Sequence, residues 1–321
     1  MEAVSSSPTR PTRPTRSTHQ RRPSQSAGKP KGAALKEREA ARRALAASAQ
    51  GRANQRRRLV TVLAPIGAVL AVLAVLVVVR VATSQDHAGK KTRSASAIVI
   101  AQVTGVPAAT FDAAGAPAKR SPTITATGGG ALTADGKTRV LYIGAEYCPF
   151  CATERWPLIV ALSRFGTWHG LKYSYSAPSP EVFPDTPTFT FHGATYASRY
   201  VSFTGVETAT NRQVDGSYEP LDKLGADDTA IMKQYDPQGS IPFTDLGGRW
   251  VINGATYDPT VIHGKTHAAI AATLAQATSA SGKAIDSAAN VLTAAICQGT
   301  GGQPAAVCTS PGVVAAGKTL P

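Results

Sequence analysis

The chain contains apolar runs of different lengths between polar stretches, and these runs predict most of its structural elements. The longest run, Leu59–Val79, has 21 residues and no charge. As a helix rising about 1.5 Å per residue it is roughly 31 Å long, which matches the ~30 Å apolar core of a bilayer. The short run Arg139–Ile143 is instead typical of a buried strand. We therefore expect one membrane helix followed by an α/β domain.

Periodicity and turn residues predict the other elements of this domain. Gly247-Gly248 lies between two short apolar runs and indicates a β-hairpin formed by residues 243–246 and 249–253. The other predicted elements are helices at residues 96–103, 151–165, 227–235, 267–278 and 284–297, and strands at residues 171–176, 188–192 and 200–206.

These patterns divide the chain into four segments. Residues 1–58 begin with a repeated Pro-Thr-Arg triplet and have almost no large apolar side chains, so we expect a disordered basic tail. Residues 59–82 form the predicted transmembrane helix, residues 83–130 a stalk and lead-in, and residues 131–321 the folded domain.

Most of the positive charge lies in the tail. Of the net charge of +14, residues 1–58 contribute +12, from 15 Lys and Arg against three Glu, which leaves +2 for all other residues. A folded part this close to neutral argues against specific nucleic-acid binding. A basic cluster beside a membrane span is attracted to anionic lipid headgroups, so the lipid bilayer is the expected partner of the tail.

Arginines indicate the orientation of the expected span. Arg56, Arg57 and Arg58 precede it, and only Arg80 follows it closely. The positive-inside bias then places the N-terminus in the cytoplasm and the folded domain outside it. The basic region is too long for a signal peptide, so we expect an uncleaved single-pass anchor in the cell membrane.

The four cysteines all follow the span and form two close pairs. Cys148-Pro149-Phe150-Cys151 is a CxxC motif between a predicted strand and a predicted helix. A thiolate at a helix N-terminus is stabilised by unpaired backbone amides and the helix dipole. A second cysteine one turn later can attack a mixed disulfide. Cys148 is therefore the expected nucleophile and Cys151 the resolving thiol, and the two form a disulfide when oxidised.

Other interpretations of the cysteines stay open. The CxxC pair could be an inert structural disulfide, or half of a zinc site completed by Cys297 and Cys308. The ten residues between Cys297 and Cys308 do not fit the short repeated spacings of zinc sites. A structural disulfide between them, worth roughly 2–3 kcal/mol, is favoured over a second redox pair that relays electrons. His263 and His267 are more typical of a helix start or surface than of a metal site, so no metal is expected.

A resemblance supports the redox interpretation. The segment Val140–Cys151 resembles the active-site segment of thioredoxins, in which a hydrophobic strand leads into the CxxC motif. Ile241-Pro242-Phe243, which opens the predicted hairpin, is similar to the cis-proline loop of that fold. The string from Tyr142 to Trp156 also resembles an uncharacterised family of thioredoxin-like, membrane-anchored bacterial proteins, over roughly residues 95–310.

This resemblance implies the fold and several site residues. It implies a thioredoxin-like fold, a cis Pro242, and an Ile241 backbone that pairs with the substrate chain beside Cys148. No bound cofactor is expected. Tyr142, Glu146 and Glu154 are candidate modulators of the thiols, although Glu154 could equally face solvent.

Two departures from thioredoxins change what the resemblance implies. Tyr142 stands where cytoplasmic thioredoxins have a buried acid, which puts efficient reductase behaviour in doubt. About ninety residues separate Cys151 from Pro242, so residues 177–240 hold an insertion between the CxxC helix and the hairpin. The aromatic residues of the insertion suggest a surface near the site or, more simply, core packing; they are Phe189, Phe191, Tyr200 and Phe203.

The sequence therefore predicts a membrane-anchored thiol–disulfide oxidoreductase. Its expected partners are extracytoplasmic proteins with cysteines and a membrane redox partner. The alternative is a non-catalytic envelope binding or scaffold protein with the same fold and two structural disulfides. Whether the site works as oxidant, reductant or isomerase does not follow from the sequence.

Overall fold

The computed structural model describes residues 89–321. The predicted basic tail and the predicted membrane span Leu59–Val79 lie outside the described residues. Within residues 89–321, no single helix has both the length and the apolar composition to cross a membrane. Two consecutive helices joined by a bend, Ala97–Thr104 and Ala108–Ala114, have the required length and composition only when taken together.

The described part is a mixed α/β structure, as predicted. Its helices are α2 (Ala97–Thr104), α3 (Ala108–Ala114), α4 (Pro149–Leu162), α5 (Ala226–Tyr235), the short 3-10 helix η1 (Pro259–Val261), α6 (His267–Thr273), α7 (Ala280–Gly299), α8 (Ala305–Cys308) and α9 (Pro311–Gly317). Its strands are β1 (Arg93–Ser94), β2 (Ile124–Ala126), β3 (Thr133–Ala134), β4 (Lys137–Gly144), β5 (Gly166–His169), β6 (Lys172–Tyr175), β7 (Pro187–Thr190), β8 (Thr195–Ser198), β9 (Val201–Glu207), β10 (Ala209–Val214), β11 (Ser217–Pro220), β12 (Phe243–Leu246) and β13 (Trp250–Asn253).

The central sheet is built around β4. It has the order β2-β13-β12-β4-β3, and β9 also pairs with β4. β9 runs parallel to β4, whereas β12 and β13 run antiparallel to their neighbours. β4 therefore has one parallel neighbour, β9, and two antiparallel neighbours, β12 and β3, with α4 in the connection from β4 toward β9.

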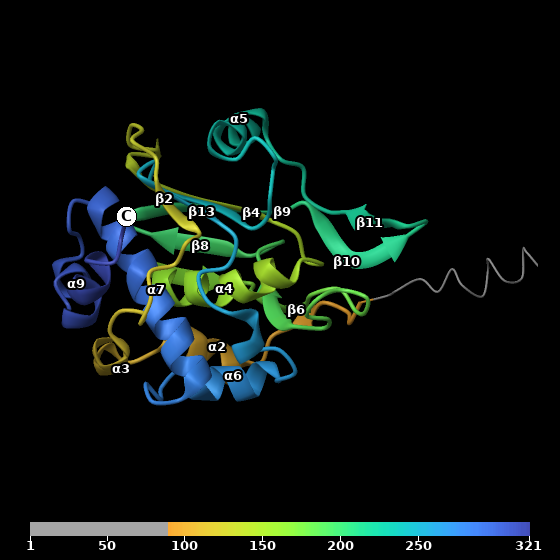
Figure 1. The fold of residues 1–321 in the computed structure, drawn as a ribbon, viewed down its shortest axis with the longest axis horizontal. Coiled ribbons are helices and arrows are strands. Elements are labelled where there is room, and N and C mark those ends of the chain that lie inside the picture. The colour runs from red at the N-terminus through yellow and green to blue at the C-terminus, as the bar shows by residue number, and fades with distance from the viewer. Residues whose placement is uncertain (1–88) are drawn as a thin grey trace, which may run out of the picture. The chain divides into compact units, whose positions relative to one another are not determined.

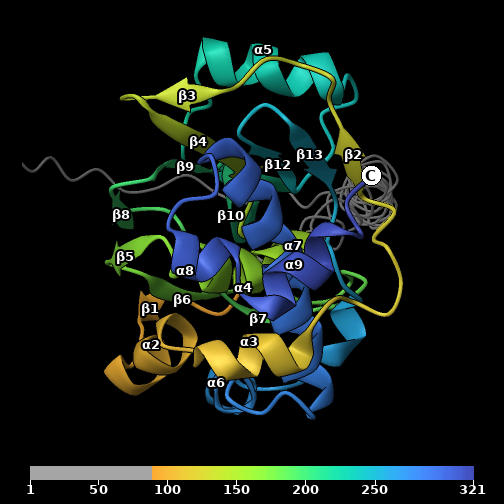
Figure 2. The ribbon, with the colours of Figure 1, turned by 90° about the vertical axis from the view of Figure 1, so that its left-hand side faces the viewer.

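Helices cover both faces of this sheet. α5 lies on one face, and α4 and α7 lie on the other, with α2, α3 and α6 as a further layer beyond them (Figures 1 and 2). Leu141 and Ile143 of β4 pack with Met232 of α5, whereas Val140 and Tyr142 join the large cluster around α4 and α7. Burial on both faces explains why β4 is a continuous apolar run rather than an alternating one.

Most predicted elements are present, with shifted ends. α4 begins at Pro149 because Cys148 is its N-cap, and α7 extends the predicted helix 284–297 at both ends. The predicted hairpin forms with Gly247 and Gly248 at φ 69° and 72°, a left-handed conformation that glycine adopts without strain. α6 ends at Thr273, earlier than the predicted Thr278.

The segment before residue 131 belongs largely to the folded domain. Val103 of α2 and Phe111 of α3 are buried in the large cluster, and β2 pairs with β13. A hydrogen bond also ties this segment to α7, because the side-chain amide of Asn290 donates from Nδ2 to the Phe111 carbonyl oxygen at 2.8 Å. The part of the stalk and lead-in that the structure describes is thus packed against the domain instead of standing apart from it.

Candidate redox site

Cys148 lies at the point where the central strand passes into a helix. β4 ends at Gly144, and Cys148 has the extended backbone of an N-cap residue, with Pro149 in the first turn. The Cys151 amide donates a hydrogen bond to the Cys148 sulfur at 3.3 Å. The sulfur thus takes the role that a Ser or Asp oxygen usually has at a helix start.

Ile241 and Pro242 lie beside Cys148, as the resemblance implies. The Cys148 thiol points to the Ile241 carbonyl oxygen at 3.7 Å, and the Ile241–Pro242 peptide bond is cis. β12, which follows directly, pairs antiparallel with β4, Phe243 opposite Ile143. This pairing brings two segments far apart in the sequence to the same end of the sheet.

The two thiols differ in exposure and acidity. Cys148 keeps 5% of its surface exposed, and Cys151 none. A hydrogen bond from the Cys151 thiol holds the pKa of Cys148 below its usual value, and the Cys151 amide and Arg155 act in the same direction against burial. Burial raises the pKa of Cys151 well above its usual value. Cys148 is thus the better thiolate, which fits the predicted order of attack.

The CxxC cysteines are free thiols in the structure, whereas the C-terminal pair is bonded. Cys148 and Cys151 are both unbonded, so their disulfide stays a prediction for the oxidised protein. Cys297 and Cys308 do form the predicted disulfide, with their Cα atoms 5.6 Å apart. It joins the end of α7 to α8.

A buried ion pair lies behind the thiols. Arg155, one turn after Cys151, donates from Nε and Nη2 to the Glu207 carboxylate at the end of β9, and neither side chain has exposed surface. Arg155 Nη2 also donates to the Ala145 carbonyl oxygen at 2.7 Å. The positive charge of Arg155 lowers the pKa of both thiols. Sequence reasoning missed this pair, because nothing local in the sequence links residues 155 and 207.

Tyr142 does not replace the acid of thioredoxins. It is fully buried, packs edge-on against Phe191 with ring centroids 4.9 Å apart, and lies with its ring 5.8 Å from the Arg155 guanidinium. Burial raises the pKa of Tyr142 well above its usual value. The tyrosine therefore stays protonated and cannot serve as a base near neutral pH.

The two predicted glutamate modulators are both buried, so Glu154 does not face solvent. The Thr92 hydroxyl donates to Glu146 Oε2 at 3.4 Å. Glu154 Oε2 accepts from the amide and the hydroxyl of Thr256, each at 2.7 Å. Burial raises the pKa of Glu154 to about 8, although the two Thr256 hydrogen bonds oppose this.

The predicted aromatic residues of the insertion pack in the core. Phe189 and Phe191 are buried, and Tyr200 and Phe203 pack against the same cluster, which supports the simpler of the two expectations. Two other aromatic residues of the insertion reach the site instead. Phe183 lies edge-on to Phe150 at 6.1 Å, and Tyr218 stacks on Tyr147 with centroids 3.9 Å apart. The single signal in the sequence was that these residues lie in the insertion.

A groove opens beside the thiols. Its volume is about 490 Å³, and its lining includes Phe150, Ile241, Asn253 and Tyr257. Phe150, between the cysteines, is 39% exposed. Phe150 and Ile241 thus place the groove close to Cys148.

The histidines have structural contacts. His267 is buried at the start of α6, with Nε2 at 2.6 Å from the Thr188 carbonyl oxygen, and burial lowers its pKa to about 4. His263 Nδ1 lies 3.5 Å from the Thr186 hydroxyl. Residues 89–321 contain no group of three or more His, Cys, Asp or Glu that could hold a metal.

The fold and the site define an α/β protein with a buried dithiol at a helix N-terminus. Residues 126–298 match a family described as "Domain of unknown function (DUF929)", and because the match covers more than half of the chain, the protein belongs to this family. Comparison with curated proteins and with solved structures gave no match.

Proposed function

We propose that the protein is a thiol–disulfide oxidoreductase that acts on protein thiols and disulfides outside the cytoplasm. The observation that carries this proposal is the Cys148 sulfur at the α4 N-cap, which accepts the Cys151 amide at 3.3 Å. This arrangement favours a thiolate at the one thiol of the pair that retains exposed surface.

The chemistry follows from the two thiols. In the oxidised protein, a substrate thiolate attacks the Cys148 sulfur, a mixed disulfide forms, and Cys151 leaves and takes up a proton. A second substrate thiolate then attacks the mixed disulfide, so that the substrate is oxidised and Cys148 leaves as a thiolate. In the reverse sequence, the Cys148 thiolate attacks a substrate disulfide and one substrate sulfur leaves as a thiolate. Cys151 then attacks the Cys148 sulfur of the mixed disulfide, and the second substrate sulfur leaves, so that the substrate is reduced and the dithiol is oxidised.

The sheet order supports a thioredoxin-like fold as part of the proposal. In β9-β4-β12-β13, the central strand leads into the helix that carries the dithiol, its parallel neighbour follows that helix, and two antiparallel strands complete the order. Thioredoxin-like proteins have this strand order. The strands β5–β8, β10 and β11 then belong to the insertion or its edges.

Membrane attachment is the second part of the proposal. It is supported by the uncharged run Leu59–Val79 and by the three arginines that precede it. With that orientation the dithiol lies where disulfides persist, and its substrates are secreted or membrane proteins.

A trapping experiment tests the catalytic claim. We expect Cys151→Ala in the full-length chain to accumulate mixed disulfides with envelope proteins, because the second attack is blocked. Cys148→Ala is the matched control and should accumulate none. A folded Cys151→Ala protein without mixed disulfides would overturn the proposal. A reduction potential below about −300 mV for the pair would then favour the alternative, a scaffold with two structural disulfides.

A further inference from the structure

The reaction proposed above needs a proton carrier at Cys151. This thiol has no exposed surface, so its proton cannot exchange directly with bulk water when it attacks or leaves. Tyr142 has no acidic proton to offer near neutral pH. The inference below therefore rests on the proposed function and concerns the same site.

We propose that Glu154 carries protons to and from Cys151. Glu154 lies three residues after Cys151 on α4, so both side chains lie on the same face of the helix, about 5–6 Å apart at their Cβ atoms. The Glu154 side chain has no exposed surface. Proton transfer between two such side chains can run directly or through an intervening water.

One oxygen of Glu154 is held and the other is free to carry the proton. Oε2 accepts both Thr256 hydrogen bonds at 2.7 Å. Oε1 is buried and has no hydrogen-bond partner among residues 89–321. A buried carboxyl oxygen without a partner costs free energy, so its retention in the core needs a reason.

The other acidic groups near the thiols are engaged elsewhere. Glu207 is bound to Arg155, and Glu146 is turned to Thr92. Burial places the pKa of Glu154 at about 8, within the range in which a carboxyl can both give and accept a proton near neutral pH. The thiols themselves face Arg155, Tyr142 and Tyr147.

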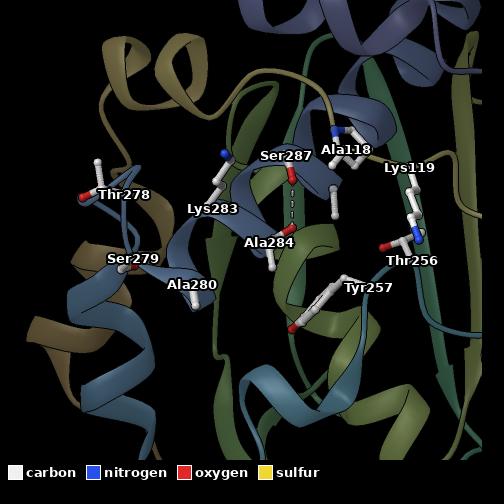
Figure 3. Close-up of a pocket in the computed structure, with 12 residues that line it drawn as sticks. Ala118, Lys119, Thr256, Tyr257, Thr278, Ser279, Ala280, Lys283, Ala284 and Ser287 are labelled. Atoms are coloured by element: carbon white, nitrogen blue, oxygen red, sulfur yellow. Dashed lines mark hydrogen bonds between the residues drawn. The ribbon is translucent and has the colours of Figure 1, made fainter.

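Thr256 also lines a cavity that is open to solvent. Its volume is about 350 Å³, and Thr256, Tyr257 and Lys119 line the same side of it (Figure 3). Tyr257 is the titratable group that faces Glu154 from the loop, and Lys119 and Lys283 line the cavity. Thr256 thus both binds the Glu154 carboxyl and lines this cavity.

The balance of the step is simple. When Cys151 attacks the mixed disulfide, its proton passes to the Glu154 carboxylate, a Cys151–Cys148 bond forms, and the partner leaves as a thiolate. When a substrate thiolate attacks the oxidised site, the Cys151–Cys148 bond breaks, and Glu154 returns the proton to Cys151.

A chromogenic disulfide, dithiobis(nitrobenzoate), separates the two steps in the reduced full-length protein. Attack by Cys148 releases one coloured thiolate, and attack by Cys151 on the resulting mixed disulfide releases a second. We expect Glu154→Gln to leave the first phase unchanged and to slow the second by roughly tenfold to a hundredfold at neutral pH. In the wild type, the second phase should accelerate as pH rises toward the Glu154 pKa of about 8, and Glu154→Gln should lose this acceleration.

Two further variants keep the test independent of folding. Thr256→Val removes one hydrogen bond to the Glu154 carboxylate and so raises the pKa of Glu154. The midpoint of the curve of second-phase rate against pH should therefore move to higher pH. Asp286→Asn is the matched control, because Asp286 is also buried, with its pKa raised by burial to about 8, but lies on α7 facing Arg164. It should leave both phases unchanged.

The outcomes distinguish this inference from the proposed function. If the wild type releases only one thiolate per Cys148, Cys151 does not resolve and the oxidoreductase proposal fails. If both are released but Glu154→Gln matches the wild type in rate and pH profile, the oxidoreductase proposal stands and the role of Glu154 is overturned. Equal slowing by Glu154→Gln and Asp286→Asn would also overturn it.

Discussion

Arg155 Nη2 donates to the Ala145 carbonyl oxygen at 2.7 Å, and the Cys148 amide donates to the same oxygen at 3.3 Å. The buried guanidinium therefore holds the loop between β4 and α4 at the residue whose carbonyl also binds the Cys148 amide. Glu207 fixes the guanidinium from the end of β9. β9 thus contributes to the site through the Glu207 carboxylate as well as through its pairing with β4.

Loss of the Arg155 charge should weaken both the fold and the site. We expect Arg155→Met to cost about 3–5 kcal/mol in the free energy of unfolding, because Glu207 is left buried without its partner. The pKa of Cys148 should rise as well, since Arg155 lowers it. Urea denaturation measures the first effect. Lys90→Met is the control, because the Lys90–Asp185 pair is exposed and should contribute less than about 1 kcal/mol.

The two thiols should differ strongly in reactivity. In the native, reduced protein we expect iodoacetamide to modify Cys148, with a titration midpoint below the ordinary cysteine value of about 8.5. Cys151, which is fully buried and has a raised pKa, should react only after unfolding. Mass spectrometry of alkylated peptides over a pH series checks both statements. Preferential labelling of Cys151 would contradict the assignment of Cys148 as nucleophile.

Local sequence was sufficient for the parts of the site that lie within one turn or one strand. The CxxC motif after a continuous apolar run placed Cys148 at a helix start, and Gly247-Gly248 placed the hairpin that carries Ile241 and Pro242. The Cys297–Cys308 disulfide also followed from short spacing.

Contacts between distant segments did not follow from the sequence. Arg155 and Glu207 look like two ordinary surface charges until β9 is known to pair with β4. Glu154 could not be assigned to the interior, because its partner Thr256 is about a hundred residues away. The roles of the aromatic residues of the insertion were ambiguous, because the same residue types occur in cores and on surfaces. Only the fold shows that Phe189 is buried in the core and that Tyr218 stacks on Tyr147.

The C-terminal disulfide should stabilise the domain by constraining the unfolded chain. Its two cysteines are 11 residues apart, and a loop of this size is worth roughly 2–3 kcal/mol. We expect the double variant Cys297→Ala, Cys308→Ala to lose about this much in urea denaturation and to keep its reaction with dithiobis(nitrobenzoate). A simultaneous loss of the Cys148 reaction would instead support the relay interpretation of this pair.

The buried carboxyls should make the protein less stable as pH rises. Burial raises the pKa of Glu154 to about 8, so between the unfolded value near 4.5 and pH 8 the folded protein binds more protons than the unfolded chain. The contribution of Glu154 to the free energy of unfolding is therefore fully present below about pH 4 and is lost as pH rises through 8. We expect Glu154→Gln to flatten the fall between pH 5 and 8 by up to about 1.4 kcal/mol per pH unit. An unchanged slope in denaturation over this range would contradict burial of an ionisable Glu154.

The stacked pair Tyr147 and Tyr218 should affect protein substrates more than small reagents. Tyr218 comes from β11 of the insertion, lies parallel to the Tyr147 ring, and its hydroxyl donates to Glu181 at 2.8 Å. Tyr218→Ala removes a ring from the rim of the site, and a loss of about 1 kcal/mol corresponds to a roughly fivefold higher KM for a disulfide-containing protein substrate. The reaction of Cys148 with dithiobis(nitrobenzoate) should not change, because this small reagent can reach the thiol without contacting Tyr218. Tyr218→Phe keeps the ring and should behave as the wild type, so an equal effect of both variants would assign the role to the hydroxyl rather than to stacking.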